Sequence, residues 1–204
     1  MTGRLNKKTI IVTGAGSGLG RASSLKLADE GAKVFCVDVN SETVKETSDI
    51  ITSRGGVAFH YQADMCSETE IIAMVTEAEK TYNGIDGLLA NAGIAGTGAA
   101  HETSLEDWDR LIKVSLTGKW LCAKHVIPHF IAKKSGNIVF QSSICALNGF
   151  PKLVAYTAAK GAIAAITRQM ASDYGEYNIR INAIAPGTIE TALVRETYKQ
   201  RLDD

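Results

Sequence analysis

The stretch Thr13-Gly-Ala-Gly-Ser-Gly-Leu-Gly20 decides the fold of this chain. It follows an apolar run of strand length, Lys8–Thr13, and leads into a helical pattern from about Ser17 to Glu30. Glycines in such a turn let the backbone bend sharply and approach a pyrophosphate, which then lies against unpaired N–H groups at the helix N-terminus. A plain loop between a strand and a helix has a similar composition, so the position of the turn, at the first strand–helix junction, carries the interpretation.

Apolar runs of strand length and longer helical patterns alternate along the rest of the chain. The further expected strands are Lys33–Asp38, Val57–Gln62, Ile85–Ala90, Asn137–Gln141 and Ile179–Ile184. The further expected helices are Ser41–Arg54, Ser67–Tyr82, Ser104–Lys134 with Pro128 as a point of bending, Val154–Tyr174 and Thr191–Arg201. Because the strands are continuously apolar rather than alternating, we expect both of their faces to be buried. The sequence therefore predicts an α/β fold, a doubly wound parallel sheet of the Rossmann type with helices on both faces.

Composition limits the class of protein. The chain has 204 residues, 45% of them hydrophobic, with 22 Lys and Arg balanced by 22 Asp and Glu. This length and hydrophobic content indicate one globular domain, residues 1–204. Zero net charge without a basic stripe argues against binding of nucleic acid, and no run of roughly eighteen apolar residues is present to span a membrane. Without a signal-peptide core either, we expect a cytoplasmic protein.

Cysteine and histidine give no sign of a metal site. We expect all four cysteines to be small buried hydrophobic residues because they are scattered singly; they are Cys36, Cys66, Cys122 and Cys145. His125 and His129 have a metal-ligand spacing on a predicted helix, but no third ligand or intervening Glu lies nearby. The sequence therefore predicts no metal.

The residue that ends the second strand bears on the choice of cofactor. Asp38 lies eighteen residues beyond Gly20, where a carboxylate accepts hydrogen bonds from the adenosine ribose of a dinucleotide and repels a 2′-phosphate. No Lys or Arg lies between Gly14 and Gly20, and Val39 and Asn40 follow Asp38. Because a cation for the 2′-phosphate of NADP is missing there, the sequence favours NAD.

A tyrosine, a lysine and a serine form the candidate catalytic group. Tyr156 and Lys160 are four residues apart, on one face of a predicted helix, and Ser143 follows the fifth strand, where open α/β sheets place their sites. Oxidation of an alcohol needs a base, and a tyrosine with an ordinary pKa of about 10 is too weak at neutral pH. We expect the charge of Lys160 to lower that pKa and Ser143 to hold the substrate oxygen. Ser142 is the alternative to Ser143.

These motifs, in this order, resemble the short-chain dehydrogenase/reductase (SDR) family in its classical form. The spacing T-G-x-x-x-G-x-G at 13–20 matches the family, as do Asn91-Ala92-Gly93, Tyr156 with Lys160, and Pro186-Gly187, so the resemblance covers nearly the whole chain. It implies a nicotinamide cofactor, a small alcohol or ketone as substrate, and a homodimer or homotetramer.

The resemblance also implies which residues bind the cofactor. They are Gly14, Ser17, Gly18, Leu19, Gly20, Asp38, Asp64, Met65, Asn91, Ala92, Gly93, Val114, Tyr156, Lys160, Pro186, Gly187, Thr188, Ile189 and Thr191. Asp64 is implied to bind the adenine amino group, Val114 to pack near the adenosine, and Lys160 to bind the nicotinamide ribose. The segment after Pro186 is implied to hold the nicotinamide carboxamide.

One catalytic position departs from the family. Ser115 stands where the resemblance implies an Asn that anchors a water in the proton relay from the catalytic lysine to solvent. A serine hydroxyl can bond water but lacks the reach of an amide and its separate donor and acceptor. Either the relay is rebuilt with another water, which we favour, or turnover is reduced.

The long helix suggests a subunit interface. From Trp108 to Ile131 the polar sector is narrow, with Lys119 outside it; the sector contains Arg110, Lys113, Thr117 and Lys124. One sheet face cannot cover the apolar arc that remains, which contains Trp108, Leu116, Trp120, Ile127 and Ile131. We expect this arc and the following alanine-rich helix to meet a second subunit. Burial under a further C-terminal part of the chain is the alternative.

The end of the sequence gives a further expectation. By the resemblance, residues 188–204 are the start of a substrate lid, and the remainder of the lid and a seventh strand are absent. Ile179–Ile184 would then be an exposed apolar edge, which natural proteins avoid. We therefore expect the 204 residues to belong to a longer polypeptide.

Taken with the resemblance, the residues predict an NAD-dependent oxidoreductase that interconverts a secondary alcohol and a ketone, with Ser143, Tyr156, Lys160 and Ser115 as the catalytic set. Two alternatives remain open: a dinucleotide-binding scaffold or sensor with little turnover, and an NADP-linked ketone reductase.

Overall fold

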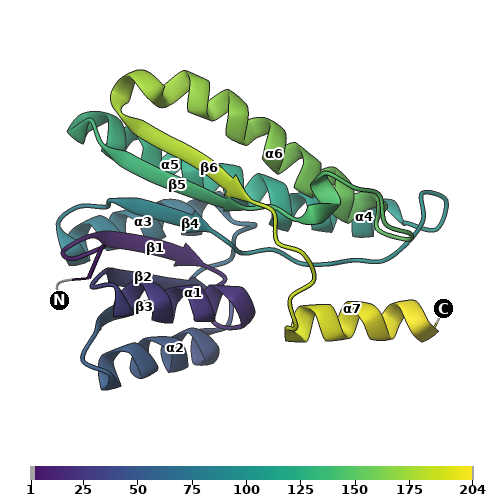
Figure 1. Cartoon of the computed structure of the whole chain (residues 1–204), viewed down its shortest axis with the longest axis horizontal. Helices are drawn as coiled ribbons and strands as arrows, with labels where there is room; N and C mark the ends of the chain where they lie inside the picture. Colours follow the sequence, from purple (N-terminus) through teal and green to yellow (C-terminus); the bar gives the residue numbers. More distant parts are fainter. Residues whose placement is uncertain (1–2, 204) are drawn as a thin grey trace.

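The sheet is parallel and doubly wound. The computed structural model describes residues 3–203, with side chains as far as residue 197, and within that range six parallel strands form one sheet in the order β3-β2-β1-β4-β5-β6 (Figure 1). The strands are β1 (Thr9–Thr13), β2 (Lys33–Asp38), β3 (Val57–Gln62), β4 (Gly87–Ala90), β5 (Gly136–Gln141) and β6 (Ile179–Ile184). The order reverses between β1 and β4, so the crevice beyond the carboxyl ends of these two strands is where a ligand is expected to bind.

Helices cover both faces of the sheet. They are α1 (Gly18–Asp29), α2 (Ser41–Ser53), α3 (Glu68–Tyr82), α4 (Leu105–Ile112), α5 (Gly118–Lys133), α6 (Val154–Tyr174) and α7 (Ala192–Asp203). Figure 1 shows α1 and α2 on one side, α6 on the other, and α7 set apart at the end of an extended segment that follows β6. None of the described helices is long and apolar enough to cross a membrane.

Two hydrophobic cores hold the layers together. The larger core joins the sheet to α3, α5 and α6 and includes Phe35, Phe130 and Ile163, all fully buried. The smaller core joins β1 and β2 to α2 and includes Val34 and Val44. Burying an aliphatic or aromatic side chain of this size contributes about 1.5–3 kcal/mol, so these cores fix the strand ends that form the site.

The two outer strands correct the expectation that every strand is buried on both faces. β3 pairs only with β2, and β6 only with β5, among the described residues. Val57 in β3 and Ile184 in β6 are 49% and 47% exposed. The apolar runs alone could not show this, because the exposure of a strand depends on its place in the order of the sheet.

The long expected helix, residues 104–134, is interrupted at a different place from the one predicted. A π-helical turn, Lys113–Thr117, lies between α4 and α5, whereas Pro128 lies inside α5 and does not end it. The expectation that all four cysteines are buried is wrong for Cys66, which is only partly buried in the loop between β3 and α3.

Most of the apolar arc on the long helix is covered by the chain itself, contrary to expectation. Ile127 is in the larger core, Leu116 and Ile131 pack against it, and Trp108 packs with Leu111 and Ala159. The helices α3 and α6 cover the arc from both sides. The expectation considered only one face of the sheet and left out these neighbouring helices. Trp120 stays 43% exposed.

Candidate active site

The candidate site is a cavity of about 400 Å³ at the carboxyl ends of the strands. Its walls come from the glycine turn, from the ends of β2, β4 and β5, from the start of α6 and from the segment after β6. Eighteen of the site residues predicted from the sequence line it: Gly14, Ser17, Gly18, Leu19, Asp38, Asp64, Met65, Asn91, Ala92, Gly93, Val114, Ser143, Tyr156, Lys160, Pro186, Gly187, Ile189 and Thr191. Gly20, Ser115 and Thr188 are not among the lining residues.

The glycine turn is closely packed against the loop after β4. Gly14 has a φ of 66°, and a Cβ there would meet the Asn91 amide and the Ala92 backbone. Gly20 lies directly behind the turn, where a Cβ would overlap the Gly14 carbonyl oxygen. The Asn91 Nδ2 donates to the carbonyl oxygens of Thr13 and Gly14 at 3.0 and 3.2 Å. Gly20 therefore shapes the turn from behind, whereas Asn91 holds the turn from the loop after β4 and also lines the cavity.

The N-terminus of α1 is left without a cap. The N-cap residue Ser17 makes no side-chain hydrogen bond to the helix, and the first turn of α1 contains no acidic residue. By contrast, α2, α3 and α4 are each capped by a side chain, of Asn40, Ser67 and Ser104 respectively, and each has an acidic residue in its first turn. An uncapped helix N-terminus that opens on a cavity suits an anion such as a pyrophosphate.

Two acidic side chains at one end of the cavity are held by backbone N–H groups. The Asp38 carboxylate accepts from Gly16 N at 2.9 Å and from Asn40 N at 3.0 Å. The Asp64 carboxylate accepts from Cys66 N at 2.8 Å. Met65 lies against Gly118 of α5 and presents part of its surface to the same end. This end can therefore take a ribose and a flat ring with a hydrogen-bond donor.

Ser143, Tyr156 and Lys160 meet at the other end of the cavity. Lys160 is 4% exposed, its Nζ donates to the Gln141 carbonyl oxygen at 3.0 Å, and it lies 5.3 Å from the centre of the Tyr156 ring. Ser142 is otherwise engaged, because its hydroxyl donates to the Lys160 carbonyl oxygen at 2.8 Å and ties β5 to α6. The geometry therefore favours Ser143 over Ser142 as the partner of Tyr156.

The electrostatics of this group differ from the expectation. Burial raises the pKa of Tyr156, against a smaller lowering by its hydrogen bond with Ser143. Burial also lowers the pKa of Lys160 to about 8. The expected lowering of the tyrosine pKa by Lys160 is thus not seen in this structure, because desolvation of the phenolate outweighs the favourable contacts.

Ser115 lies behind the cavity wall. It is fully buried in the π-helical turn, and its hydroxyl accepts from Ile94 N at 3.1 Å and donates to Ile94 O at 3.2 Å. The side chain therefore joins the long helix to the loop after β4, and both hydrogen-bonding capacities of the hydroxyl face the backbone of one residue.

The segment after β6 closes one side of the site. Ser142 N donates to Ile184 O at 2.8 Å and Ile144 N to Pro186 O at 2.9 Å, which fastens this segment to the end of β5. The cavity is then lined by Ile189 and by the first residues of α7, including Leu193, which is 44% exposed.

Sequence reasoning missed the contacts of two basic residues near the site. Arg21, the residue after Gly20, donates to the Gly16 carbonyl oxygen at 2.7 Å. Lys119 is 2% exposed, and its Nζ donates to the Ala90 carbonyl oxygen at the end of β4 at 2.7 Å. Each lies four residues after a residue already singled out, Ser17 and Ser115, and this helical spacing was the available signal.

No group of three or more His, Cys, Asp or Glu side chains is placed to hold a metal ion in the part of the chain that the structure describes. Of the two spaced histidines, His125 pairs with Glu68, at 2.9 Å, and His129 with Glu79, at 3.6 Å.

Comparison with known proteins identifies the family. The family model described as short chain dehydrogenase matches residues 8–202. The chain belongs to the short-chain dehydrogenase family. Among its relatives, 2-(S)-hydroxypropyl-CoM dehydrogenase 3 of Xanthobacter autotrophicus is 39% identical over 93% of this chain and 74% of its own length.

Solved structures agree with this assignment. The crystal structure of levodione reductase superposes on this short-chain dehydrogenase with a TM-score of 0.95 and 34% identity, over 98% of this chain and 79% of that one. The crystal structure of NAD⁺-bound xylitol dehydrogenase does so with a TM-score of 0.92 and 33% identity, over 96% of this chain and 75% of that one. The chain is therefore an SDR oxidoreductase with a Rossmann-like fold, from a family that uses NAD or NADP.

Proposed function

We propose that this short-chain dehydrogenase interconverts a secondary alcohol and a ketone, with NAD as the hydride acceptor or donor. The observation that carries the proposal is the shared cavity. Ser143, Tyr156 and Lys160 line one end, Asp38 and Asp64 line the other, and the uncapped N-terminus of α1 lies between them. An extended dinucleotide fits this order of groups, with its adenosine at the acidic end and its nicotinamide beside Tyr156.

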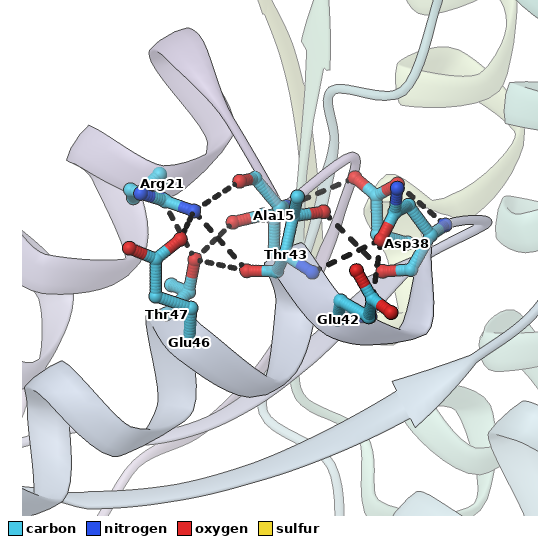
Figure 2. Close-up of polar contacts among 9 residues, drawn as sticks. Ala15, Arg21, Asp38, Glu42, Thr43, Glu46 and Thr47 are labelled. Carbon is cyan, nitrogen blue, oxygen red and sulfur yellow. Dashed lines mark hydrogen bonds and ion pairs between the residues drawn. The ribbon is translucent and has the colours of Figure 1, made fainter.

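Asp38 supports NAD rather than NADP. Its carboxylate is fixed by two backbone N–H groups and retains free lone pairs for ribose hydroxyls. A 2′-phosphate would bring two negative charges to the same place. The neighbouring cation, Arg21, pairs with Glu46 and bonds carbonyl oxygens behind the turn, so it does not compensate (Figure 2).

The side chains of the site divide the work of alcohol oxidation. NAD⁺ bound in this cavity would supply the acceptor for the hydride of the alcohol carbon and a positive charge in the site. Ser143 binds the alcohol oxygen, and the Tyr156 phenolate oxygen takes the hydroxyl proton as the C–H bond breaks. Lys160, charged below a pH of about 8, stabilises the phenolate from the next turn of α6. In the reverse direction, the Tyr156 hydroxyl returns its proton to the ketone oxygen.

The buried setting of Tyr156 makes this division of work necessary. Because burial raises the pKa of Tyr156, its phenolate needs nearby positive charge before it can act as a base at neutral pH. Lys160 and an oxidised nicotinamide are the two sources of that charge. Binding of NAD⁺ and activation of the base are therefore coupled.

We also propose that the protein self-associates through α5 and α6, with Trp120 at the contact. Support comes from the Trp120 ring of α5, which is 43% exposed although it is large and apolar. The self-association is independent of the catalytic proposal.

Initial-rate measurements test the proposed reaction. The purified protein is supplied with NAD or NADP and a panel of cyclic and acyclic secondary alcohols, and with NADH and the matching ketones. We expect turnover of at least one alcohol, faster with NAD. Tight NAD binding without turnover of any member would favour the scaffold alternative, and a preference for NADP would contradict the role of Asp38.

A further inference from the structure

Arg21 lies outside the cavity but is connected to the peptide groups that form its phosphate end. Its guanidinium donates to Gly16 O at 2.7 Å, to Thr43 O at 3.3 Å and, through Nε, to the Thr47 Oγ1 at 3.0 Å, and it pairs with Glu46. Figure 2 shows Arg21 between the glycine turn and α2, on the side of the turn away from Asp38. The planar fork of an arginine can hold several acceptors in fixed directions, which a lysine cannot.

Thr47 continues this connection to the ribose end. Its side chain is fully buried, and its hydroxyl donates to Ala15 O at 2.9 Å while accepting from Arg21 Nε. The N–H of the same Ala15–Gly16 peptide group donates to the Asp38 carboxylate at 2.9 Å. One peptide group thus joins Thr47 to Asp38, and its orientation sets that of the carboxylate.

The next peptide group is held in the same way. Arg21 binds the Gly16 carbonyl oxygen, and the peptide bonds of this turn are trans. Because a trans peptide points its C=O and N–H in opposite directions, fixing Gly16 O behind the turn directs the Ser17 N–H forward. Ser17 lines the cavity at the uncapped start of α1, so this N–H points to the place of the pyrophosphate.

We propose that Arg21, acting with Thr47, is a positioning residue for the cofactor. The pair holds two consecutive peptide groups of the glycine turn, so that Asp38 meets the adenosine ribose and Ser17 N–H meets the pyrophosphate. Neither residue touches the cofactor. This inference rests on the proposed function insofar as the ligand is a dinucleotide, and it concerns the adenosine diphosphate half only.

The close fit around Gly16 makes the turn sensitive to such support. A Cβ at Gly16 would overlap the Thr43 Oγ1 and lie 2.9 Å from the Asp38 carboxylate. Gly16 is therefore enclosed between α2 and Asp38. Because glycine tolerates a wide range of backbone angles, its peptide groups can reorient when the hydrogen bonds of Arg21 and Thr47 are removed. Loss of the Arg21 bonds should release the turn without disturbing Tyr156 at the far end.

Binding of ADP-ribose and steady-state kinetics with NAD test the inference together. Arg21→Met keeps the length of the side chain and removes all its donors, Arg21→Lys keeps the charge without the fork, and Thr47→Val keeps the shape without the hydroxyl. Arg54→Met, at the exposed C-cap of α2, is the matched control. We expect Arg21→Met to raise the Kd for ADP-ribose and the KM for NAD about tenfold, with kcat within about twofold. Thr47→Val should act in the same direction, Arg21→Lys should restore part of the affinity, and the control should match the wild type.

The outcomes separate this inference from the proposed function. If the wild type binds ADP-ribose and both Arg21→Met and Thr47→Val bind it with the same affinity, the positioning role alone is overturned. Lower Tm values of the variants would not change that conclusion. A fall in kcat at constant KM would overturn it as well. Binding of ADP-ribose that depends on Arg21, in a protein that oxidises no alcohol, would support the inference while contradicting the proposed function. A wild type that binds no dinucleotide would overturn both.

Discussion

Replacement of Lys160 by methionine should change how the stability of the protein depends on pH. Lys160 is 4% exposed, and burial lowers its pKa from 10.5 to about 8. The unfolded chain therefore binds this proton more tightly than the folded protein does. The charged lysine destabilises the folded state fully below a pH of about 8, and the penalty disappears as the pH rises toward the unfolded value.

The size of the effect follows from the shift. One pKa unit corresponds to about 1.4 kcal/mol, so the full penalty is about 3 kcal/mol, and about 2 kcal/mol of it is lost between a pH of about 6.5 and about 9.5. Lys160→Met lacks this penalty. Its free energy of unfolding minus that of the wild type should therefore decrease by about 2 kcal/mol over this range. Loss of the bond to Gln141 O displaces the difference by a similar amount at each pH.

Urea unfolding followed by circular dichroism at several pH values measures this difference. Lys45→Met, which removes an exposed lysine of α2, controls for the general effect of losing one positive charge. A difference between Lys160→Met and wild type that stays constant within about 0.5 kcal/mol, after correction with the control, would refute the argument from burial.

The remaining predictions concern single positions. The kcat/KM with NAD should exceed that with NADP by at least about tenfold, and Asp38→Ser should reduce this ratio. Equal kcat/KM values for the two cofactors in the wild type would contradict the prediction. The wild-type protein should oxidise at least one alcohol although Ser115 stands in the place of an Asn. Ser115→Asn should change kcat by no more than about tenfold, because the Ser115 hydroxyl bonds to the Ile94 backbone. An inactive wild type that Ser115→Asn activates would contradict it. Complete burial and the nearby Lys160 hold the pKa of Lys119 well below its usual range. The free energy of unfolding of Lys119→Met minus that of the wild type, measured with urea, should therefore be larger at neutral than at alkaline pH. A pH-independent difference would exclude that explanation.

The sequence predicted the elements well because each carries its own local signal. The alternation of apolar strands with helical patterns predicted all six strands, within two residues at their ends, and Asp38 and the glycine turn could be placed from their positions alone. The same local signals could not show that β3 and β6 are outer strands. That depends on the order of strands in the sheet, which no single run contains.

The electrostatics of the site needed the structure. Lys119 lies on an apolar side of its helix and is buried because a carbonyl oxygen from another element, Ala90, accepts from it. The raised pKa of Tyr156 likewise results from burial by residues distant in sequence, whereas its spacing to Lys160 predicted only attraction. Arg21 and Thr47 could not be paired from the sequence, since their contact depends on how α1 and α2 pack.

The central claim is that Tyr156 transfers the proton while the rest of the cavity holds NAD. The most direct test is a parallel measurement of kcat for alcohol oxidation and of the Kd for NAD in the wild type and in Tyr156→Phe. The phenylalanine ring keeps the packing against Lys160 and removes only the hydroxyl. We predict that kcat falls by at least about a hundredfold while the Kd for NAD changes by less than about threefold. A variant that keeps more than about a tenth of the wild-type kcat would contradict the account.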